Sequence, residues 1–156
     1  MAIGSADRVN EKRSVKTINV SQAEGLALGW LVAKADTNLY PVGDIRLLDG
    51  KLLSINAGDY EYSDRWRQYS PSTDWSQGGP IIEREGINLS VDYQDSALSN
   101  DMVQIGWKGN LWNNSVPGTA GFLQWAYGPT PLIAAMRCFV ASKLGETVEV
   151  PEELCK

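Results

Sequence analysis

The sequence predicts an α+β fold in which an antiparallel sheet of about three to five strands carries an N-terminal and a C-terminal helix on one face. Three observations support this prediction: apolar residues at helical spacing near both ends, apolar–polar alternation between residues 87 and 127, and an Asp-Gly turn signal. A length of 156 residues fits one domain. We expect a flexible tail over residues 1–16, one domain over 17–145, and an acidic C-terminal tail or short terminal strand over 146–156.

The N-terminal helix is predicted from a capping pattern. Ser21 and Glu24 have the spacing of a capping box, in which a serine and a glutamate satisfy free backbone amides at the start of a helix. Apolar residues then recur at helical spacing to about Ala35. Gly25 and Gly29 each weaken a helix by up to about 1 kcal/mol relative to alanine. Glycines four residues apart also let another backbone approach closely.

The middle of the chain carries turn and helix-end signals. Residues 44–56 are predicted to form a β-hairpin around Asp49-Gly50, because this dipeptide suits a turn with positive φ at both central residues. A short helix is predicted to begin near Asp74 or Pro80 and to end at Gly86.

Three alternating runs predict the main strands of the sheet. We expect each run to be half-buried, with Trp107 and Trp125 in the core together with Trp30 of the first helix. The connection over residues 108–120 is too long for a tight turn and is predicted to be an exposed loop. The apolar members of the three runs are Ile87, Leu89, Val91 and Tyr93; Val103, Ile105 and Trp107; and Leu123, Trp125 and Tyr127.

The last helix has signals at both of its ends. Thr130 is a suitable N-cap, and Pro131 stands at the first helical position, where its missing N–H is not needed. Gly145 is a suitable residue to end the helix.

Composition and charge exclude several classes of function. The chain has no histidine, which excludes Ser-His-Asp and Cys-His nucleophiles and any zinc site with a histidine ligand. The net charge is −5, with +2 in residues 1–16 and −7 in the remainder. An acidic body argues against non-specific binding to nucleic acid or anionic membranes, which needs a basic face.

The location and assembly of the protein are inferred from what the sequence lacks. There is no apolar run of the ~20 residues that a membrane span needs and no signal-peptide apolar region at the N-terminus. The two cysteines, Cys138 and Cys155, do not by themselves support a disulfide. We therefore expect a cytoplasmic monomer with no cofactor, no metal and no membrane partner.

The segment from Tyr60 to Trp75 interleaves aromatic residues with Arg65 and Arg67. Such residues stack on bases or sugars, anchor protein interfaces, or close the core around a long loop, and the pattern leaves all three open. Trp66, Trp75 and Trp112 fall in predicted loops, so these tryptophans are the better surface candidates.

Carboxylates and one arginine are the remaining polar candidates. Asp74, Glu83 and Glu85 could serve acid–base chemistry or a hard cation, although Asp74 also suits a helix cap and Glu83 a solvated position. Arg137 lies between buried positions of the last helix, where it either pairs with an acidic residue or binds a ligand.

Two stretches resemble the NinX-like family of phage and prophage proteins: residues 69–85, YSPSTDWSQGGPIIERE, and residues 128–143, GPTPLIAAMRCFVASK. The segment 20–35 is similar to that family's N-terminal helix, and the resemblance extends over about residues 17–146. It implies an accessory phage function in a bacterial cytoplasm and carries no catalytic residue. The polar and aromatic positions of these stretches, together with Trp66, become the candidate binding residues: Tyr69, Ser72, Asp74, Trp75, Glu83, Arg137 and Trp66.

Three functions remain as hypotheses. The first is a small non-enzymatic module that binds a host or phage protein through the aromatic segment of residues 60–85. The second is a nucleic-acid-associated protein, because the order helix, three strands, helix resembles that of double-stranded-RNA-binding domains. The third is a carboxylate- or metal-dependent enzyme.

Overall fold

The computed structural model describes residues 7–8, 14–37, 45–55, 66–95, 101–113 and 121–155. It confirms the α+β class, but the strands form three antiparallel sheets instead of one. The helices are α1 (Gly25–Ala35), α2 (Trp75–Glu85) and α3 (Pro131–Leu144), with short 3-10 turns η1 (Val20–Gln22) and η2 (Glu152–Leu154). The strands are β1 (Asp7–Arg8), β2 (Val15–Asn19), β3 (Ile45–Leu48), β4 (Lys51–Ile55), β5 (Trp66–Gln68), β6 (Asn88–Asp95), β7 (Met102–Asn113), β8 (Phe122–Gly128) and β9 (Thr147–Pro151).

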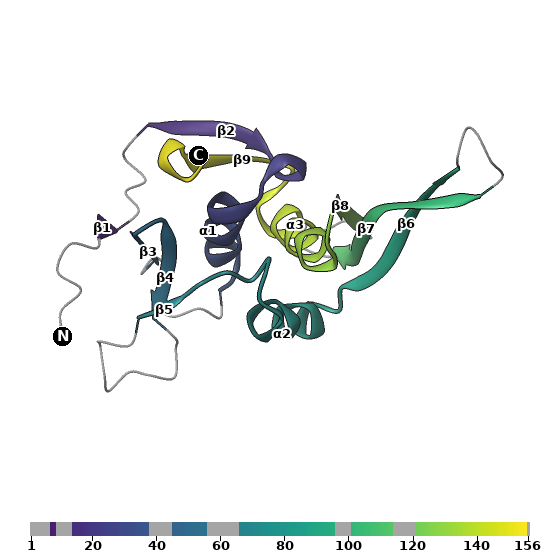
Figure 1. Cartoon of the computed structure of the whole chain (residues 1–156), viewed down its shortest axis with the longest axis horizontal. Helices are drawn as coiled ribbons and strands as arrows, with labels where there is room; N and C mark the ends of the chain where they lie inside the picture. The colour runs from purple at the N-terminus through teal and green to yellow at the C-terminus, as the bar shows by residue number, and fades with distance from the viewer. Residues whose placement is uncertain are drawn as a thin grey trace.

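The three sheets surround two central helices. One sheet has the order β1-β3-β4-β5, a second pairs β2 with β9, and a third has the order β6-β7-β8. Figure 1 shows α3 between α1 and the β6-β7-β8 sheet, with α2 below it and the long β6–β7 hairpin extending away from the body. The helix α3 packs directly on β7 and β8 and also contacts α1.

The hydrophobic core is centred on the contact between α1 and α3. Leu28 and Leu31 of α1 and Met136 and Phe139 of α3 are almost completely buried. Trp30 is also buried, as its helical spacing predicted. Burying a side chain of this size stabilises the folded state by about 1.5–3 kcal/mol relative to leaving it exposed.

The predicted start of the first helix is wrong. Ser21 lies in η1, where its amide donates to the Asn19 carboxamide oxygen, and α1 begins only at Gly25. The residue before the helix, Glu24, makes no side-chain capping bond. Gly25 has a φ of +54°, which changes the direction of the backbone between η1 and α1. Residues with a side chain rarely adopt such a value. The close neighbour at Gly29 is a side chain and not the expected backbone: an added Cβ would lie 3.1 Å from Leu52 Cδ1, whereas the nearest backbone atom, the Tyr69 carbonyl oxygen, is 3.7 Å away.

The hairpin and the ends of the later helices follow the sequence signals. Asp49 and Gly50 both have positive φ and join β3 to β4. The Asp74 carboxylate accepts the Ser76 amide as the N-cap of α2, which ends at a left-handed Gly86. Thr130 caps α3 by accepting the Ile133 amide at 3.2 Å.

The predicted loop over residues 108–120 is wrong in its first half, since β7 continues to Asn113. Gly109 lies within this part of the strand, where it packs against α3. A Cβ at Gly109 would lie 2.9 Å from the Ala134 carbonyl oxygen, and one at Gly128 would lie 2.6 Å from the Ala134 amide nitrogen. The glycines therefore let α3 lie against the backbone of β7 and β8.

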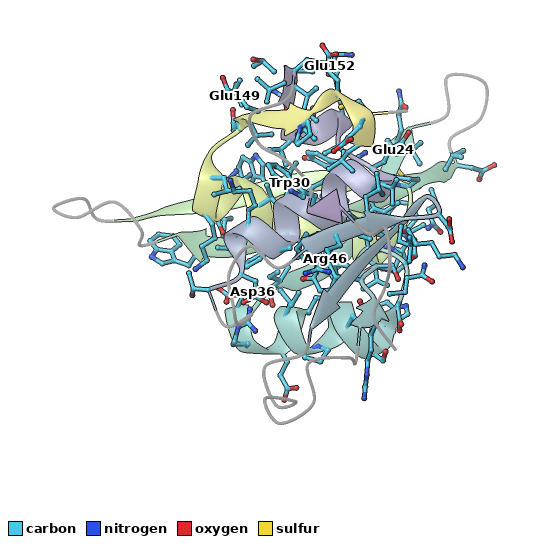
Figure 2. The ribbon with its side chains drawn as sticks, turned by 90° about the vertical axis from the view of Figure 1, so that its left-hand side faces the viewer. Glu24, Trp30, Asp36, Arg46, Glu149 and Glu152 are labelled. Carbon is cyan, nitrogen blue, oxygen red and sulfur yellow. The ribbon has the colours of Figure 1, made fainter. Side chains whose placement is uncertain are left out.

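Paired strands also lie beyond residues 17–145 on both sides. Val15 begins β2, and β9 pairs with it in antiparallel register, so the expected terminal strand is present after residue 146. Figure 2 shows Glu149 and Glu152 at the outer edge formed by β9 and η2. At the other end, Asp7–Arg8 forms β1 beside β3 within the region expected to be a flexible tail.

Candidate functional site

The outer face of the β6-β7-β8 sheet carries large exposed side chains. Gly109, Leu111, Gln124 and Gly128 lie on the face that α3 covers, and the alternate residues of the same strands therefore point away from α3. Residues opposite each other in an antiparallel pair share a face, which places Lys108 beside Tyr127 and Trp112 beside Leu123. We call this surface the aromatic face, and its members are Lys108, Trp112, Leu123, Trp125 and Tyr127.

The aromatic face is accessible and contains one cation. Trp112, Trp125 and Tyr127 are 59%, 50% and 48% exposed, respectively. The Lys108 ammonium lies 4.5 Å from the centroid of the Trp125 ring and 5.8 Å from that of Tyr127. These cation–π contacts hold the two rings and the charge in one arrangement before anything binds.

A pocket of about 560 Å³ adjoins the aromatic face at β8. Trp125 and Tyr127 belong both to this pocket and to the aromatic face. Arg137 of α3 also lines the pocket, which is bounded on the other side by η1. The pocket lies beside an edge strand, because β8 is paired only with β7 in the described part of the chain.

The buried Arg137 connects three segments of the fold. Its Nε donates to the Ala23 carbonyl and its Nη1 to the Tyr127 carbonyl, both at 2.9 Å. Burial lowers the pKa of the Arg137 guanidinium, and the negative charge of Glu24 partly opposes this shift. The predicted pairing with an acidic residue is absent, since Arg137 makes no ion pair with any residue that the structure describes.

A second, smaller pocket of about 260 Å³ brings two of the other predicted residues together. Ser72 and Trp75 line it with Thr130 and Leu132 at the start of α3. Trp75 is 55% exposed, as expected of a surface tryptophan, whereas Ser72 is buried. This pocket places the two stretches that resemble the NinX-like family side by side.

Tyr69 is a residue of the hydrophobic core. It is buried, and among the described residues its hydroxyl has no hydrogen-bond partner. Burial, reinforced by the negative charge of Asp36, raises the pKa of Tyr69, while Arg84 opposes the shift.

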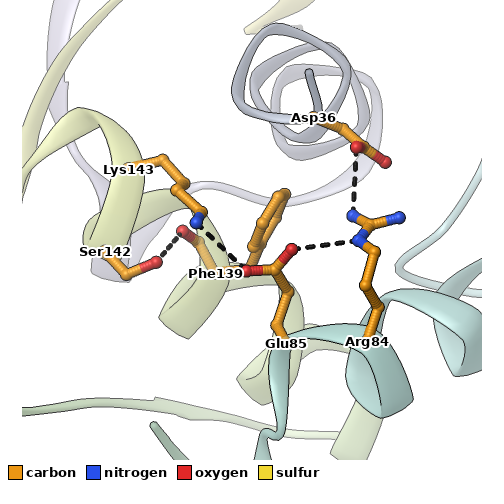
Figure 3. Close-up of polar contacts among 6 residues, drawn as sticks. All are labelled: Asp36, Arg84, Glu85, Phe139, Ser142 and Lys143. Carbon is orange, nitrogen blue, oxygen red and sulfur yellow. Dashed lines mark hydrogen bonds and ion pairs between the residues drawn. The ribbon is translucent and has the colours of Figure 1, made fainter. Parts of the chain in front are cut away.

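A chain of ion pairs beside Tyr69 joins the three helices (Figure 3). Arg84 Nη2 lies 3.0 Å from Asp36 Oδ1, and Arg84 Nε lies 3.0 Å from Glu85 Oε1. Lys143 Nζ completes the chain at 3.1 Å from Glu85 Oε2. Glu85, a candidate acid–base residue by sequence, therefore ties α2 to α3.

The remaining predicted residues have local roles or cannot be placed. The Asp74 carboxylate bonds the Ser76 amide and hydroxyl, and these hydrogen bonds lower the pKa of Asp74. Glu83 is exposed on α2. Trp66 lies in β5, but its side chain is outside the described residues, as is the segment of residues 56–65.

Three further features bear on chemistry and location. In the described ranges, no group of three or more cysteine, aspartate or glutamate side chains is placed to hold a metal ion. Both cysteines are free thiols, with Cys138 buried and Cys155 exposed. No helix among the described residues is long and apolar enough to cross a membrane.

A family model described as bacteriophage P22 NinX matches residues 19–143. The chain belongs to the P22 NinX family. This confirms the resemblance inferred from residues 69–85 and 128–143. No curated protein matches the chain.

The NinX family region extends from Asn19, the last residue of β2, to Lys143, one residue before the end of α3. It contains the aromatic face, Arg137, the smaller pocket and every lining residue of the larger pocket except Glu146. The strand β9 lies outside it. The family thus identifies a phage-derived protein.

Sequence reasoning identified Trp112 as a surface residue, and it is 59% exposed, but it missed the rest of the aromatic face. Leu123, Trp125 and Tyr127 were expected on the buried side of their strand, because large apolar residues in alternation usually face the core. The signal that was overlooked lies in the small residues that alternate with these large ones along the strands. Gly109 and Gly128 are too small to fill a core by themselves, so they indicate a closely packed helix on their own side.

Proposed function

We propose that this NinX family protein is a non-enzymatic accessory module of the bacterial cytoplasm that binds a partner protein on the aromatic face. The observation that supports it most strongly is the exposure of Trp112, Trp125 and Tyr127 on a sheet face with no covering element in the described chain. Contiguous apolar patches of this kind mark interaction sites on soluble proteins, and Trp and Tyr are the residues most enriched at interface hot spots.

The composition of the aromatic face indicates the chemistry of the partner. Lys108 lies among the rings and is half-buried, so a matching surface offers an apolar patch with a carboxylate opposite Lys108. Because the cation–π contacts already fix Trp125 and Tyr127, docking loses less side-chain entropy than it would with free rings.

This proposal places the binding surface away from the segment of residues 60–85 that the sequence favoured. Trp75 remains the described alternative in that segment, with its ring exposed beside the smaller pocket. The two tryptophans belong to different elements, Trp75 to α2 and Trp125 to β8, so substitutions in one element test one surface without changing the other.

The nucleic-acid hypothesis has one structural observation in its favour. The elements α2, β6, β7, β8 and α3 follow one another in the order helix, three strands, helix. However, the two basic residues of α3 do not form an open basic face, because Arg137 is buried against two carbonyls and Lys143 pairs with Glu85. The acidic net charge of −5 also opposes phosphate binding, so we rank this function second.

The experiment is affinity capture from a host lysate with and without nuclease, followed by binding measurements with the purified captured protein. Three forms of the full chain are compared: wild type, Trp125→Ala/Tyr127→Ala, and Trp75→Ala as the matched control. We expect a protein that wild type and the control bind equally and the double variant does not. Binding lost only in Trp75→Ala would place the site beside α2, and capture abolished by nuclease would favour nucleic acid.

A further inference from the structure

Arg137 has donors that the fold does not use. A guanidinium carries five N–H donors, and the structure engages two, through Nε to Ala23 and Nη1 to Tyr127. The residue is only 8% exposed. Within the described chain, the remaining N–H groups have no acceptor.

The charge of Arg137 is likewise not neutralised by contact. Glu24 acts on it only through space, since no carboxylate of the described residues forms an ion pair with it. Guanidinium stays protonated in proteins, so a full positive charge is held in a largely desolvated place. Burying a charge without a paired counter-charge is costly, and an anionic ligand would supply that counter-charge.

The pocket that Arg137 lines has the size and lining of a small-molecule site. Its volume of about 560 Å³ falls within the range of roughly 300–1,000 Å³ that is typical of ligand pockets. Trp107 and Trp125 supply aromatic surface, and Ala126 and Ala141 supply small apolar surface. An apolar body with one anionic group matches this combination.

Two carboxylates restrict the charge of the ligand. Asp92 and Glu146 also line the pocket. Their negative charges repel a multiply charged anion such as phosphate more than they repel a single carboxylate. The lining therefore favours a monoanion over a phosphorylated compound.

We propose that the pocket between β8 and η1 binds a monocarboxylate with an aromatic or apolar body, and that the unused N–H groups of Arg137 donate to its carboxylate. Planar carboxylates match the geometry of guanidinium donors, and such charge-assisted hydrogen bonds are stronger than neutral ones. The proposal stands independently of protein docking on the aromatic face.

The test is a titration of the full chain with benzoate, followed by the NMR signals of the Arg137 Nε–H and of the tryptophan indoles. We expect a saturable shift of Arg137, Trp107 and Trp125 with a dissociation constant in the millimolar range. Benzamide, the neutral analogue, and inorganic phosphate at matched ionic strength are expected to give no saturable shift of these signals.

Two substitutions on η1 give a matched pair that leaves Arg137 intact. Ser21 is exposed and lines the pocket, whereas its neighbour Gln22 is exposed and does not. Ser21→Glu places a competing carboxylate at the pocket and is expected to weaken benzoate binding about tenfold or more. Gln22→Glu adds the same charge and is expected to keep the wild-type affinity.

Each outcome of these experiments either supports or overturns the proposed carboxylate site. Equal shifts with benzamide, shifts confined to residues away from the pocket, or equal binding by both glutamate variants would overturn the proposal. Arg137→Gln, checked for folding by circular dichroism, provides a further arm in which binding is expected to be lost. A protein that captures its partner but ignores benzoate would leave the aromatic-face function standing and remove only this one.

Discussion

Lys108 of β7 lies over the ring of Trp125 on the neighbouring strand, with 4.5 Å between the ammonium nitrogen and the ring centroid. The contact runs diagonally across the pair, because Lys108 is directly opposite Tyr127 and Trp125 is opposite Asn110. It therefore ties together two strands on the face that α3 does not cover.

The Lys108–Trp125 contact is expected to contribute a measurable coupling. In a double-mutant cycle of Lys108→Gln and Trp125→Ala, we expect a coupling free energy of about 0.5–1 kcal/mol, the range of exposed cation–π pairs. Urea unfolding of the four proteins measures it. Lys51→Gln, a change of an exposed lysine in β4, serves as the control and is expected to show no coupling to Trp125. A coupling of zero would mean that the two side chains are independent in solution.

Gly109→Ala is expected to destabilise the protein, because the added Cβ would lie 2.9 Å from the Ala134 carbonyl oxygen and 3.2 Å from the Ala135 Cα. Both atoms are backbone, so relief requires α3 to move. We expect a loss of about 1–3 kcal/mol in the free energy of unfolding, measured by urea denaturation.

Gly79→Ala is the matched control for this prediction. Gly79 lies within α2, and the nearest atom to an added Cβ is Trp75 Cε3 at 3.9 Å, an ordinary contact. Alanine in a helix is favoured over glycine by about 1 kcal/mol, so this variant is expected to be more stable than wild type. If both alanines had the same effect, close packing of α3 on β7 would not be the cause.

Glu85→Gln is expected to destabilise the protein at neutral pH and not at acidic pH. Burial acts to raise the pKa of Glu85, but hydrogen bonds from Arg84 and Lys143 outweigh it and hold the pKa below its usual value. Such a carboxylate stabilises the fold above its unfolded-state pKa, and this stability is lost as the pH falls through the lowered, folded-state pKa. Because Arg84 and Lys143 are partly exposed, we expect only about 1 kcal/mol at pH 7.

Urea unfolding of wild type and Glu85→Gln across the acidic range measures this difference. The neighbouring Glu83→Gln removes an exposed carboxylate from the same helix and is the control, expected to match wild type within about 0.5 kcal/mol. A difference that stayed constant with pH would show that the ionised state of Glu85 is irrelevant to stability.

Local signals in the sequence correctly predicted one turn and the starts of two helices. Asp49-Gly50, the Asp74 cap and the Thr130 cap were located correctly because each feature depends on a few adjacent residues. The capping box at Ser21 failed although its pattern is equally local. The positive φ of Gly25 interrupts the chain there, and no residue pattern specifies that conformation.

Which face of a strand is buried depends on partners that are distant in sequence. The β8 alternation fixed two sets of residues but not which set meets α3. The set that meets α3 is determined by the close approach of Ala134 to Gly109 and Gly128, which is a contact between α3 and the two strands. Contacts between distant segments also decide which candidate residues share a pocket. Ser72 and Trp75 line one pocket together with the start of α3, whereas Arg137 lines the other.

The two cysteines are expected to differ sharply in reactivity. Burial raises the pKa of the Cys138 thiol to about 12, although a backbone hydrogen bond at Leu111 acts in the opposite direction. At pH 8 about one Cys138 thiol in ten thousand is then ionised, and the thiolate is the reactive form. Cys138 is also fully buried, whereas Cys155 is exposed.

We expect a thiol-specific chromogenic reagent to label one cysteine quickly in the native protein and both in guanidinium chloride. Cys155→Ser is expected to abolish the native reaction and Cys138→Ser to preserve it; rapid labelling of native Cys155→Ser would show that α3 opens from the sheet.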